Sequence, residues 1–291
     1  MTKNNLKNSI AVIMITLNEA HNLDRVFKNL RGWADEIFVL DSYSTDSTVD
    51  VCLRNGIKII QKKFEGFGSQ WNHALGAFDI NSNWVMKLDP DEVLSDELKS
   101  NIKLSIERDG LDGFYIDRRL WFMDKPLPVK QRILRIWKKG LCKFSNSLVN
   151  EYPHVNGNLG FCYGDLKHFD SPNLEHWLQK QNKYTTSEAL AAYRNHQLAT
   201  QPKLFGNSLQ RRMFIKEHFY KIPFRYQLLF LYHYLYLSAY KAGKVGWIWA
   251  NLRCMVYRLT DYKMHEFKIL GDEPLELAQG SGAPDLRCEQ H

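Results

Sequence analysis

Short apolar runs alternate with segments of helical spacing over the first hundred residues. The runs are rich in β-branched residues, as is typical of strands buried on both faces of a parallel sheet. They predict strands at residues 10–16, 36–40, 58–61 and 84–88. The segments between them predict helices at residues 22–33, 47–56, 70–78 and 95–106. Strands and helices in alternation indicate an α/β domain whose parallel strands are joined by right-handed crossovers.

The pattern changes twice further along the chain. Residues 113–168 read as a smaller strand-rich region, with glycines marking its turns. Helical spacing returns at residues 174–192 and continues through two segments rich in Leu, Tyr, Phe and Trp, at residues 224–240 and 245–259. The polar tail from Gly271 is expected to be mobile.

Basic residues flank these aromatic segments. They are Arg211, Arg212, Lys216, Lys221, Arg225, Lys241, Lys244, Arg253, Arg258 and Lys263. Residues 224–240 include Arg225, Gln227 and His233, which is too polar for a comfortable span of ~20 apolar residues. Apolar and basic positions interleaved in this way favour a helix lying in the membrane interface. A helical hairpin packed in the core is the alternative.

Polar clusters follow three of the predicted strands. They comprise Thr16, Asn18 and Glu19; residues 41–46, with Asp41 foremost; and Asp89, Asp91 and Glu92. Ligands of open α/β sheets bind beyond the carboxyl ends of the strands, so the three clusters are expected to converge on one crevice. Each cluster has a simpler reading as the capped start of the next helix, with Asn18 or Asp46 as the capping residue.

The Asp-x-Asp pair suits a hard cation, since Mg²⁺ is usually held by one or two carboxylates plus substrate phosphates. Other positions suit the rest of a nucleotide diphosphate. Gly66 and Gly68 open a helix that includes Gln70, and a helix start of this kind can bind phosphate. Arg132 and Arg135 are candidate phosphate contacts because guanidinium groups match phosphate geometry. A solvated basic strand edge is the alternative.

Composition narrows the partners. The chain is 44% hydrophobic and 24% charged, with a net charge of +7, as expected of a globular protein that can accept an anionic ligand. The positive charge is dispersed and no recognition motif is present, so nucleic acid is not expected as a partner. The five cysteines lack zinc-like spacing and indicate free thiols in a reducing cytoplasm. The apolar run at residues 10–15 is too short for a signal peptide.

Four motifs in series carry a family resemblance. They are residues 11–19, 33–46, 66–72 and 88–92. Together they resemble the family 2 glycosyltransferases, and within them a bacterial group that includes lipopolysaccharide inner-core β-1,4-glucosyltransferases. The resemblance extends over residues 10–268, through Val149-Asn150-Glu151 and His168.

The resemblance implies a GT-A fold, a nucleotide-sugar donor, bound Mg²⁺ or Mn²⁺, and inversion at the anomeric carbon. By motif position, Asp41 contacts the base, Asp89 the ribose and Asp91 the metal. Thr16, Asn18, Glu19 and Gln70 line the nucleotide pocket, and Glu151 deprotonates the acceptor. Two positions depart from the family pattern: Pro90 stiffens the acidic loop, and Asn150 replaces the usual histidine, for which His154 can compensate.

The sequence thus predicts an inverting hexosyltransferase that uses a UDP-sugar and a lipid-linked, lipopolysaccharide or capsule glycan acceptor. We expect a cytoplasmic protein, peripheral at the inner face of the cytoplasmic membrane and attracted to anionic lipid. The expected division is a catalytic domain at residues 1–205, a helical membrane-interfacial region at 206–270 and a flexible tail at 271–291. A nucleotidyltransferase acting on sugar phosphates, and a non-catalytic membrane-surface module of the same fold, are the alternatives.

Overall fold

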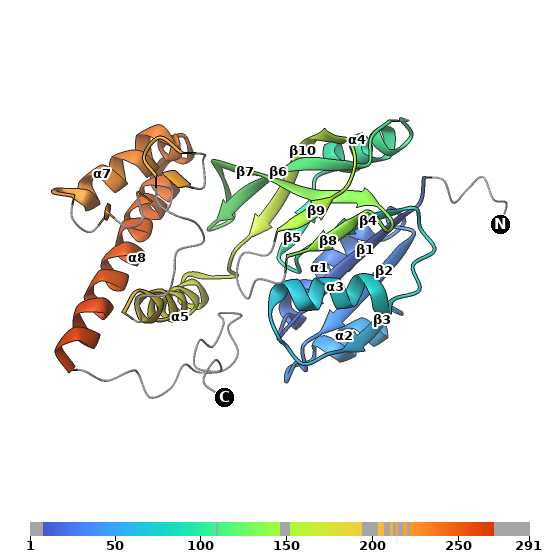
Figure 1. Ribbon diagram of the computed structural model, residues 1–291, viewed down its shortest axis with the longest axis horizontal. Coiled ribbons are helices and arrows are strands. Elements are labelled where there is room, and N and C mark those ends of the chain that lie inside the picture. The colour runs from blue at the N-terminus through green and yellow to red at the C-terminus, as the bar shows by residue number, and fades with distance from the viewer. Residues whose placement is uncertain are drawn as a thin grey trace. The chain divides into compact units, whose positions relative to one another are not determined.

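The computed structural model describes residues 8–108, 110–145, 152–193, 203–206, 210–211, 214, 218–219 and 222–270 (Figure 1). The chain forms two compact units. The first comprises residues 1–121 and 130–170, and the second comprises residues 122–129 and 171–291. The helix that begins at Leu174 therefore groups with the C-terminal helices, earlier in the chain than the expected division at residue 205.

An eight-stranded sheet organises the first unit, with strand order β3-β2-β1-β4-β7-β6-β10-β5. Its strands are β1 (Ile10–Thr16), β2 (Glu36–Asp41), β3 (Lys58–Gln61), β4 (Trp84–Lys87), β5 (Glu92–Leu94), β6 (Gly113–Phe122), β7 (Lys125–Lys138) and β10 (Leu159–Phe169). Strands β3, β2, β1 and β4 are parallel neighbours, as are β6 and β10. Strand β4 pairs antiparallel with β7, and β10 pairs antiparallel with β5. The predicted α/β class with a mixed, mainly parallel sheet is confirmed.

Four helices connect the strands of this sheet: α1 (Ala20–Leu30), α2 (Thr48–Arg54), α3 (Phe67–Ala77) and α4 (Asp96–Ile106). Successive side chains of a strand point to opposite faces. On one face, Val12 and Met14 of β1 belong to the core built with α1, α2 and α4. On the other face, Ile13 packs in a second core that includes Trp71 of α3. Burial on both sides explains why β1 is apolar throughout.

The middle of the chain is rich in strands, as expected, and most of them join the main sheet. Strands β6, β7 and β10 extend the main sheet, because β7 pairs with β4 through Val85 opposite Trp137 and Met86 opposite Ile136. Among the described residues, the short strands β8 (Cys142–Phe144) and β9 (Pro153–Val155) form a second, two-stranded sheet.

Helices make up most of the described part of the second unit. They are α5 (Leu174–Tyr193), α7 (Arg225–Leu231), the π-helix η3 (Tyr232–Tyr236), the 3₁₀-helix η4 (Ala239–Ala242) and α8 (Gly243–Leu270). Leu190 of α5 packs against Phe267 of α8. The ammonium group of Lys263 donates to both oxygens of Asn182 and to the hydroxyl groups of two neighbouring threonines, which ties α8 to α5. Of the helices described, none is both long and apolar enough to cross a membrane.

Candidate functional site

The carboxyl ends of β1, β2 and β4 lie along one edge of the sheet. Thr16, the last residue of β1, is opposite Asp41, the last residue of β2. On the other side of β1, Ile13 is opposite Lys87, and the amide of Leu88 donates to the carbonyl of Ile13. The Asp-x-Asp segment follows directly. The three polar clusters therefore begin at neighbouring strand ends, as the parallel pairing predicts.

Asp41 is completely buried and accepts hydrogen bonds on both carboxylate oxygens. Oδ1 accepts from the Thr16 hydroxyl at 3.0 Å and from the Ser44 hydroxyl, and Oδ2 accepts from the Ser44 amide and from Nε2 of Gln61 at 2.9 Å each. Each of these partners donates its hydrogen to the carboxylate. The side chain is thereby fixed in position at the end of β2.

Asn18 has a positive φ of 57°, which asparagine adopts more readily than most residues. Its Oδ1 accepts from the amide of Thr45 at 2.8 Å, so Asn18 binds the loop after β2. It does not cap its own helix: the N-cap of α1 is Glu19, without a side-chain capping bond. The Glu19 amide donates to the Thr48 hydroxyl, and its carboxylate accepts from the Asn22 side chain. The first two clusters are thus joined into one rigid wall.

Gln70 is completely buried and lies behind this wall. Its Nε2 donates to the Ser42 hydroxyl at 2.9 Å and to the Lys62 carbonyl at 3.1 Å. Its helix, α3, begins after Gly66, whose φ of 116° requires glycine. The glycine-rich turn and Gln70 therefore support the loop that follows Asp41.

A buried ion-pair cluster holds the third acidic loop. The Arg135 guanidinium donates to Oδ2 of Asp89 at 2.6 Å and to Oε1 of Glu92 at 2.7 Å, and the amide of Asp89 donates to Oε2 of Glu92. Glu92 and Arg135 are buried, whereas Asp89 is partly exposed. Although burial acts in the opposite direction, Arg135, Lys87 and Arg118 hold the pKa of Asp89 well below its usual range. Asp89 is therefore a fixed anion at the surface of the site.

Glu92 lies at the centre of the same cluster. Burial raises the pKa of Glu92, and the neighbouring Asp89 and Asp91 carboxylates act in the same direction, against the lowering effect of Arg135 and Arg118. Arg135 is the cation closest to both carboxylates, so its removal would leave Glu92 with Arg118 at 3.4 Å and Asp89 with the more distant charges of Lys87 and Arg118. The geometry of the acidic loop therefore depends on Arg135.

Asp91 meets His168 at the same end of the sheet. Oδ2 of Asp91 lies 3.2 Å from Nε2 of His168, and the amide of Phe169 donates to the Asp91 carbonyl. Burial opposes protonation of His168, but the Asp91 carboxylate prevails and raises the pKa of the imidazole. Arg25 of α1 lies over the ring of Phe169 at 4.3 Å and interacts electrostatically with Asp91. The second aspartate of the motif is therefore held by three neighbours.

Asp91 and His168 also suit a divalent cation. They offer one carboxylate and one imidazole, and both side chains are accessible at about one-fifth of their surface (19% and 17%). No group of three or more His, Cys, Asp or Glu side chains with metal-site geometry occurs among the described residues. Two protein ligands are nevertheless sufficient when substrate phosphates complete the shell, as is usual for Mg²⁺. The donor set fits the expected metal.

The two predicted phosphate contacts lie apart. Arg135 donates to Asp89 and Glu92, as described above, whereas Arg132 donates to Asp117 at 3.2 Å, lies over the ring of Phe161 and has a side chain that is 62% exposed. The structure brings Arg135, but not Arg132, to the acidic loop. A contact of either residue with phosphate stays a prediction.

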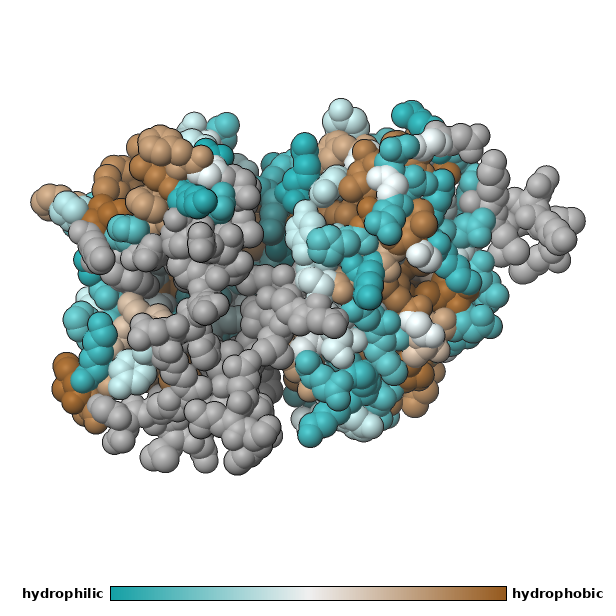
Figure 2. Space-filling model, viewed as in Figure 1, coloured by the Kyte–Doolittle hydropathy of each residue, from teal (hydrophilic) through white to brown (hydrophobic). Residues whose placement is uncertain are grey.

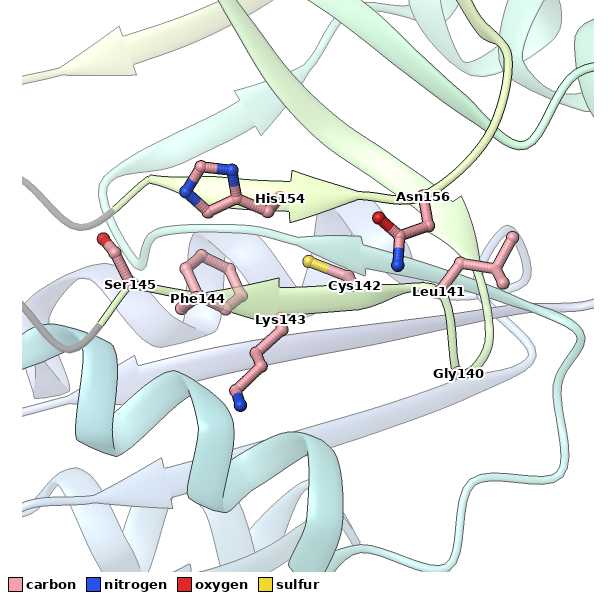
Figure 3. Close-up of a pocket in the computed structure, with 8 residues that line it drawn as sticks. All are labelled: Gly140, Leu141, Cys142, Lys143, Phe144, Ser145, His154 and Asn156. Atoms are coloured by element: carbon pink, nitrogen blue, oxygen red, sulfur yellow. The ribbon is translucent and has the colours of Figure 1, made fainter.

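Glu151, the predicted base, and Asn150 fall outside the described residues. Their positions in the sequence lie between β8 and β9, whose strands line a hollow of about 720 Å³ together with Gly140, Leu141, Ser145 and Asn156 (Figure 3). In Figure 3, His154 and Ser145 lie at the same end of the two paired strands. Lys87 is close both to this hollow and to the acidic loop. Its ammonium group lies 5.5 Å from the centroid of the Phe144 ring, and its positive charge helps to lower the pKa of Asp89.

Several residues of the site were not predicted from the sequence. Gln61 is the last residue of β3, and its contact with Asp41 follows from the register of the two strands. His168 was noted only as part of the stretch that resembles the family, and no role was predicted for it. Its contact with Asp91 depends on the pairing of β10 with β5. Arg118 reaches Glu92 at 3.4 Å from the neighbouring part of the sheet. None of the three has a local sequence signal, because each is placed by long-range strand pairing.

Known proteins resemble this chain over most of its length. An uncharacterized glycosyltransferase of Rickettsia typhi is 27% identical over 68% of this chain and 70% of its own. The lipopolysaccharide core biosynthesis glycosyltransferase LpsC of Rhizobium meliloti is 26% identical over 91% of this chain and 95% of its own. The second match covers nearly the whole of both proteins.

Among solved structures, glucosyl-3-phosphoglycerate synthase from Mycobacterium tuberculosis in complex with Mn²⁺, UDP and phosphoglyceric acid aligns with a TM-score of 0.32 at 21% identity. That alignment covers 38% of this chain and 43% of the mycobacterial chain, less than half of either. A sequence model described as Glycosyl transferase family 2 matches residues 11–167, more than half of the chain and all of the acidic strand ends described above. The chain therefore belongs to glycosyl transferase family 2.

Proposed function

We propose that the chain is an inverting, metal-dependent hexosyltransferase that uses a UDP-sugar. The observation that supports this most directly is the arrangement of its anions: Asp41 is fixed at the end of β2, while Asp89 and the Asp91–His168 pair follow β4 at the same edge. This arrangement offers separate groups to a base, a ribose and a diphosphate. The predicted GT-A fold accords with the mixed sheet of the first unit.

The donor nucleotide lies along the wall formed by Thr16, Asn18 and Glu19. Asp41 accepts from the base, and a base N–H takes the place of one of the present donors, such as Gln61. Gln70 lines the same pocket from behind and positions the loop around Asp41 through its bond to the Ser42 hydroxyl. Asp89, held in its ionised form by Arg135, accepts from a ribose hydroxyl.

Asp91 and His168 hold Mg²⁺ or Mn²⁺ together with the diphosphate. When bound, the cation stabilises the negative charge of the departing nucleoside diphosphate. Arg25 lies close enough to Asp91 to interact with its charge, and it adds a positive group on the α1 side of the same site. The chain's own residues thus orient the leaving group and balance its charge.

The reaction is a single displacement at the anomeric carbon. Glu151 accepts the proton of an acceptor hydroxyl, the hydroxyl oxygen forms the new glycosidic bond, and the bond between the anomeric carbon and the diphosphate oxygen breaks. Glu151 must come within about 2.6–3.2 Å of the hydroxyl it deprotonates. The loop that contains it joins β8 to β9, so the acceptor sugar lies in the hollow of that hairpin (Figure 3).

The acceptor is a glycan of the lipopolysaccharide, capsule or another lipid-linked class. This proposal draws on the match to LpsC, a lipopolysaccharide core biosynthesis glycosyltransferase, over 91% of this chain. Such acceptors are anchored in a membrane, and the protein works as a peripheral enzyme at the inner face of the cytoplasmic membrane. The basic, aromatic composition of residues 222–260 supports this placement.

Family membership disfavours the two rival functions, a nucleotidyltransferase and a non-catalytic membrane-surface module. A nucleotidyltransferase would form a UDP-sugar from UTP and a sugar phosphate. The test incubates the purified chain with Mn²⁺ and a panel of UDP-, GDP- and dTDP-sugars, and in parallel with UTP and sugar phosphates. Release of UDP from one UDP-sugar supports the proposal, and pyrophosphate release from UTP contradicts it.

Two variants then test the assigned roles. Asp91→Asn should abolish metal-dependent UDP release, and Glu151→Gln should abolish sugar transfer while donor binding is retained. Glu107→Gln, an exposed glutamate after α4, is the matched control and should behave as wild type. Full transfer by Glu151→Gln would assign the base to another residue.

A further inference from the structure

A stripe of exposed apolar side chains runs along α7 and η3 in the second unit. At spacings of three or four residues, one helical face shows Phe224 (76% exposed), Leu228 (53%), Leu231 (46%), Tyr232 (46%), Leu235 (54%) and Tyr236 (77%). Residues at these spacings are neighbours on a helix surface, and the rings of Tyr232 and Tyr236 stack at 5.2 Å. Figure 2 shows apolar surface gathered over α7, at the upper left. We call these six residues the α7 stripe.

The opposite face of the same helices is fixed to α8. Tyr226 donates to Asp261 at 2.7 Å, and the buried ring of His233 packs edge-on against Trp249 at 5.1 Å. The α7 stripe is therefore the outward side of a helix whose inward side is already packed. A continuous patch of exposed apolar side chains usually marks a site where a protein binds a partner or a membrane.

The segment of the chain that carries the α7 stripe is basic. From Ile222 to Thr260 the chain contains no Asp or Glu, while Arg225, Lys241, Lys244, Arg253 and Arg258 are basic. Arg225 is neutralised by Asp261 at 2.6 Å. Lys241, in η4, and Lys244, in the first turn of α8, are exposed and follow shortly after the stripe in the chain. The partner of this surface must therefore be apolar at its centre and anionic around it.

The exposed aromatic residues indicate which class of partner this surface binds. Tyr232, Tyr236, Tyr240 and Trp247 are all about half exposed or more. Tyrosine and tryptophan are enriched where hydrocarbon meets water, because one end of each ring system is apolar and the other polar. Leucines beside them, with lysines nearby, make up the composition of a helix that lies in a bilayer interface.

A second copy of the chain fits this surface less well. A symmetric dimer through the α7 stripe would bring the basic residues of both copies together without any acidic residue from the same segment to compensate them. An anionic bilayer supplies both the apolar interior and the opposite charge. A bilayer can also bind an exposed helical face without a deep cleft in the protein.

We propose that the α7 stripe is the membrane-docking surface of this protein. Its leucines and Phe224 insert into the interface of a bilayer that contains anionic phospholipid, and Lys241 and Lys244 contact the headgroups. This inference rests on the proposed function, which places the enzyme at a membrane, and it names the surface that makes the contact. The helices lie along the bilayer and do not span it.

The test measures co-sedimentation of the full chain with two kinds of vesicle, one of phosphatidylcholine alone and one in which part of it is replaced by phosphatidylglycerol. Wild type should bind the second kind, and added salt should weaken that binding because it screens the charges. Leu228→Ser/Leu235→Ser should lower vesicle affinity about tenfold or more. Lys241→Gln/Lys244→Gln should reduce affinity for the anionic vesicles only.

The matched control is Leu53→Ser/Leu104→Ser, which removes two leucines of similar exposure (61% and 56%) from the first unit and should bind vesicles as wild type does. Wild-type vesicle binding by Leu228→Ser/Leu235→Ser would overturn the proposal. A wild-type dimer that this double variant converts to monomers would overturn it too, by assigning the surface to a second copy. Release of UDP from UDP-sugar by the same variants, in the absence of vesicles, reports separately on the proposed enzymatic function.

Discussion

Oδ2 of Asp91 lies 3.2 Å from Nε2 of His168, although 77 positions separate the two residues in the chain. Strand pairing brings them together: β10 runs antiparallel to β5, with His168 opposite Glu92, the residue next to Asp91. The contact places an imidazole beside the second carboxylate of the acidic motif. A site that appears in the sequence as two aspartates is in the structure a carboxylate–imidazole pair.

We expect His168→Ala to weaken Mn²⁺-dependent donor binding about 10- to 100-fold, because one of two protein ligands is lost. Asp91→Asn should weaken Mn²⁺-dependent donor binding at least as much. Isothermal titration of UDP in the presence and absence of Mn²⁺ measures both effects. Asp79→Asn, an exposed aspartate after α3, is the matched control. Unchanged Mn²⁺ dependence in His168→Ala would exclude the imidazole from the metal site.

Replacing Arg135 should destabilise the protein strongly. In Arg135→Met, Glu92 and Asp89 lose the cation that both of them contact, and breaking a buried pair in this way costs about 3–5 kcal/mol of unfolding free energy. Urea unfolding followed by tryptophan fluorescence measures this cost. Arg132→Met on the same strand removes a guanidinium that is 62% exposed, and should cost less than about 1 kcal/mol. Equal effects of the two substitutions would refute the structural role given to Arg135.

Asp41→Asn should lower both stability and nucleotide affinity. The Ser44 amide and Nε2 of Gln61 both donate to Oδ2, so an amide –NH₂ in that place has no acceptor, and an –NH₂ in place of Oδ1 forces the Thr16 and Ser44 hydroxyls to turn and accept. A buried polar group left unsatisfied costs about 1–3 kcal/mol. Thr16→Val, which removes only one donor, should have a smaller effect. Thermal unfolding with and without UDP separates the two consequences, and a loss of UDP affinity with unchanged stability would contradict this explanation.

His233 should make stability depend on pH. Burial, with a smaller contribution from the Arg253 charge, lowers the pKa of His233 to about 4, and its ring nitrogens have no hydrogen-bond partner among the described residues. In the unfolded chain His233 binds a proton near pH 6.5, whereas in the folded chain it does so only near pH 4. The contribution of neutral His233 to the free energy of unfolding is therefore fully present above pH 6.5. It decreases as the pH falls toward 4, by about 3 kcal/mol in total.

Urea unfolding at a series of pH values measures this slope. His233→Leu should flatten it between pH 6.5 and 4, since the group that titrates differently in the two states is gone. His265→Leu, at an exposed position of α8, should leave it unchanged. The prediction is wrong if both variants retain the slope of wild type.

The first half of the fold could be predicted because its signals are local. The four expected strands correspond to β1 through β4, and the expected helices to α1 through α4, with ends that differ by a few residues. Thr16 and Asp41 were expected at one edge because adjacent parallel strands end together, and they are register partners. These features follow from runs of residues that are contiguous in the chain.

The rest depends on contacts between distant segments. The strand-rich middle was expected from its local pattern, but β7 pairs with β4 across a separation that no periodicity reveals. Arg135 was selected for its guanidinium group, yet its position beside Asp89 and Glu92 depends on that same pairing. Asn18 was expected to line the nucleotide pocket, with a helix cap as the simpler alternative, and its hydrogen-bond partner lies in the loop after the neighbouring strand. Sequence patterns identify such residues as polar and well placed, and the register of the sheet decides what they touch.

The strands β8 and β9 form a sheet that is separate from the eight-stranded sheet at whose edge Asp41, Asp89 and Asp91 lie. Phe144 anchors β8 in the core of the larger sheet beside Trp71 and Trp137, whereas His154 of β9 is exposed. If the receiving sugar binds at this hairpin, as proposed, a substitution at an exposed position such as His154 would change which acceptor is used and leave the three aspartates where they are.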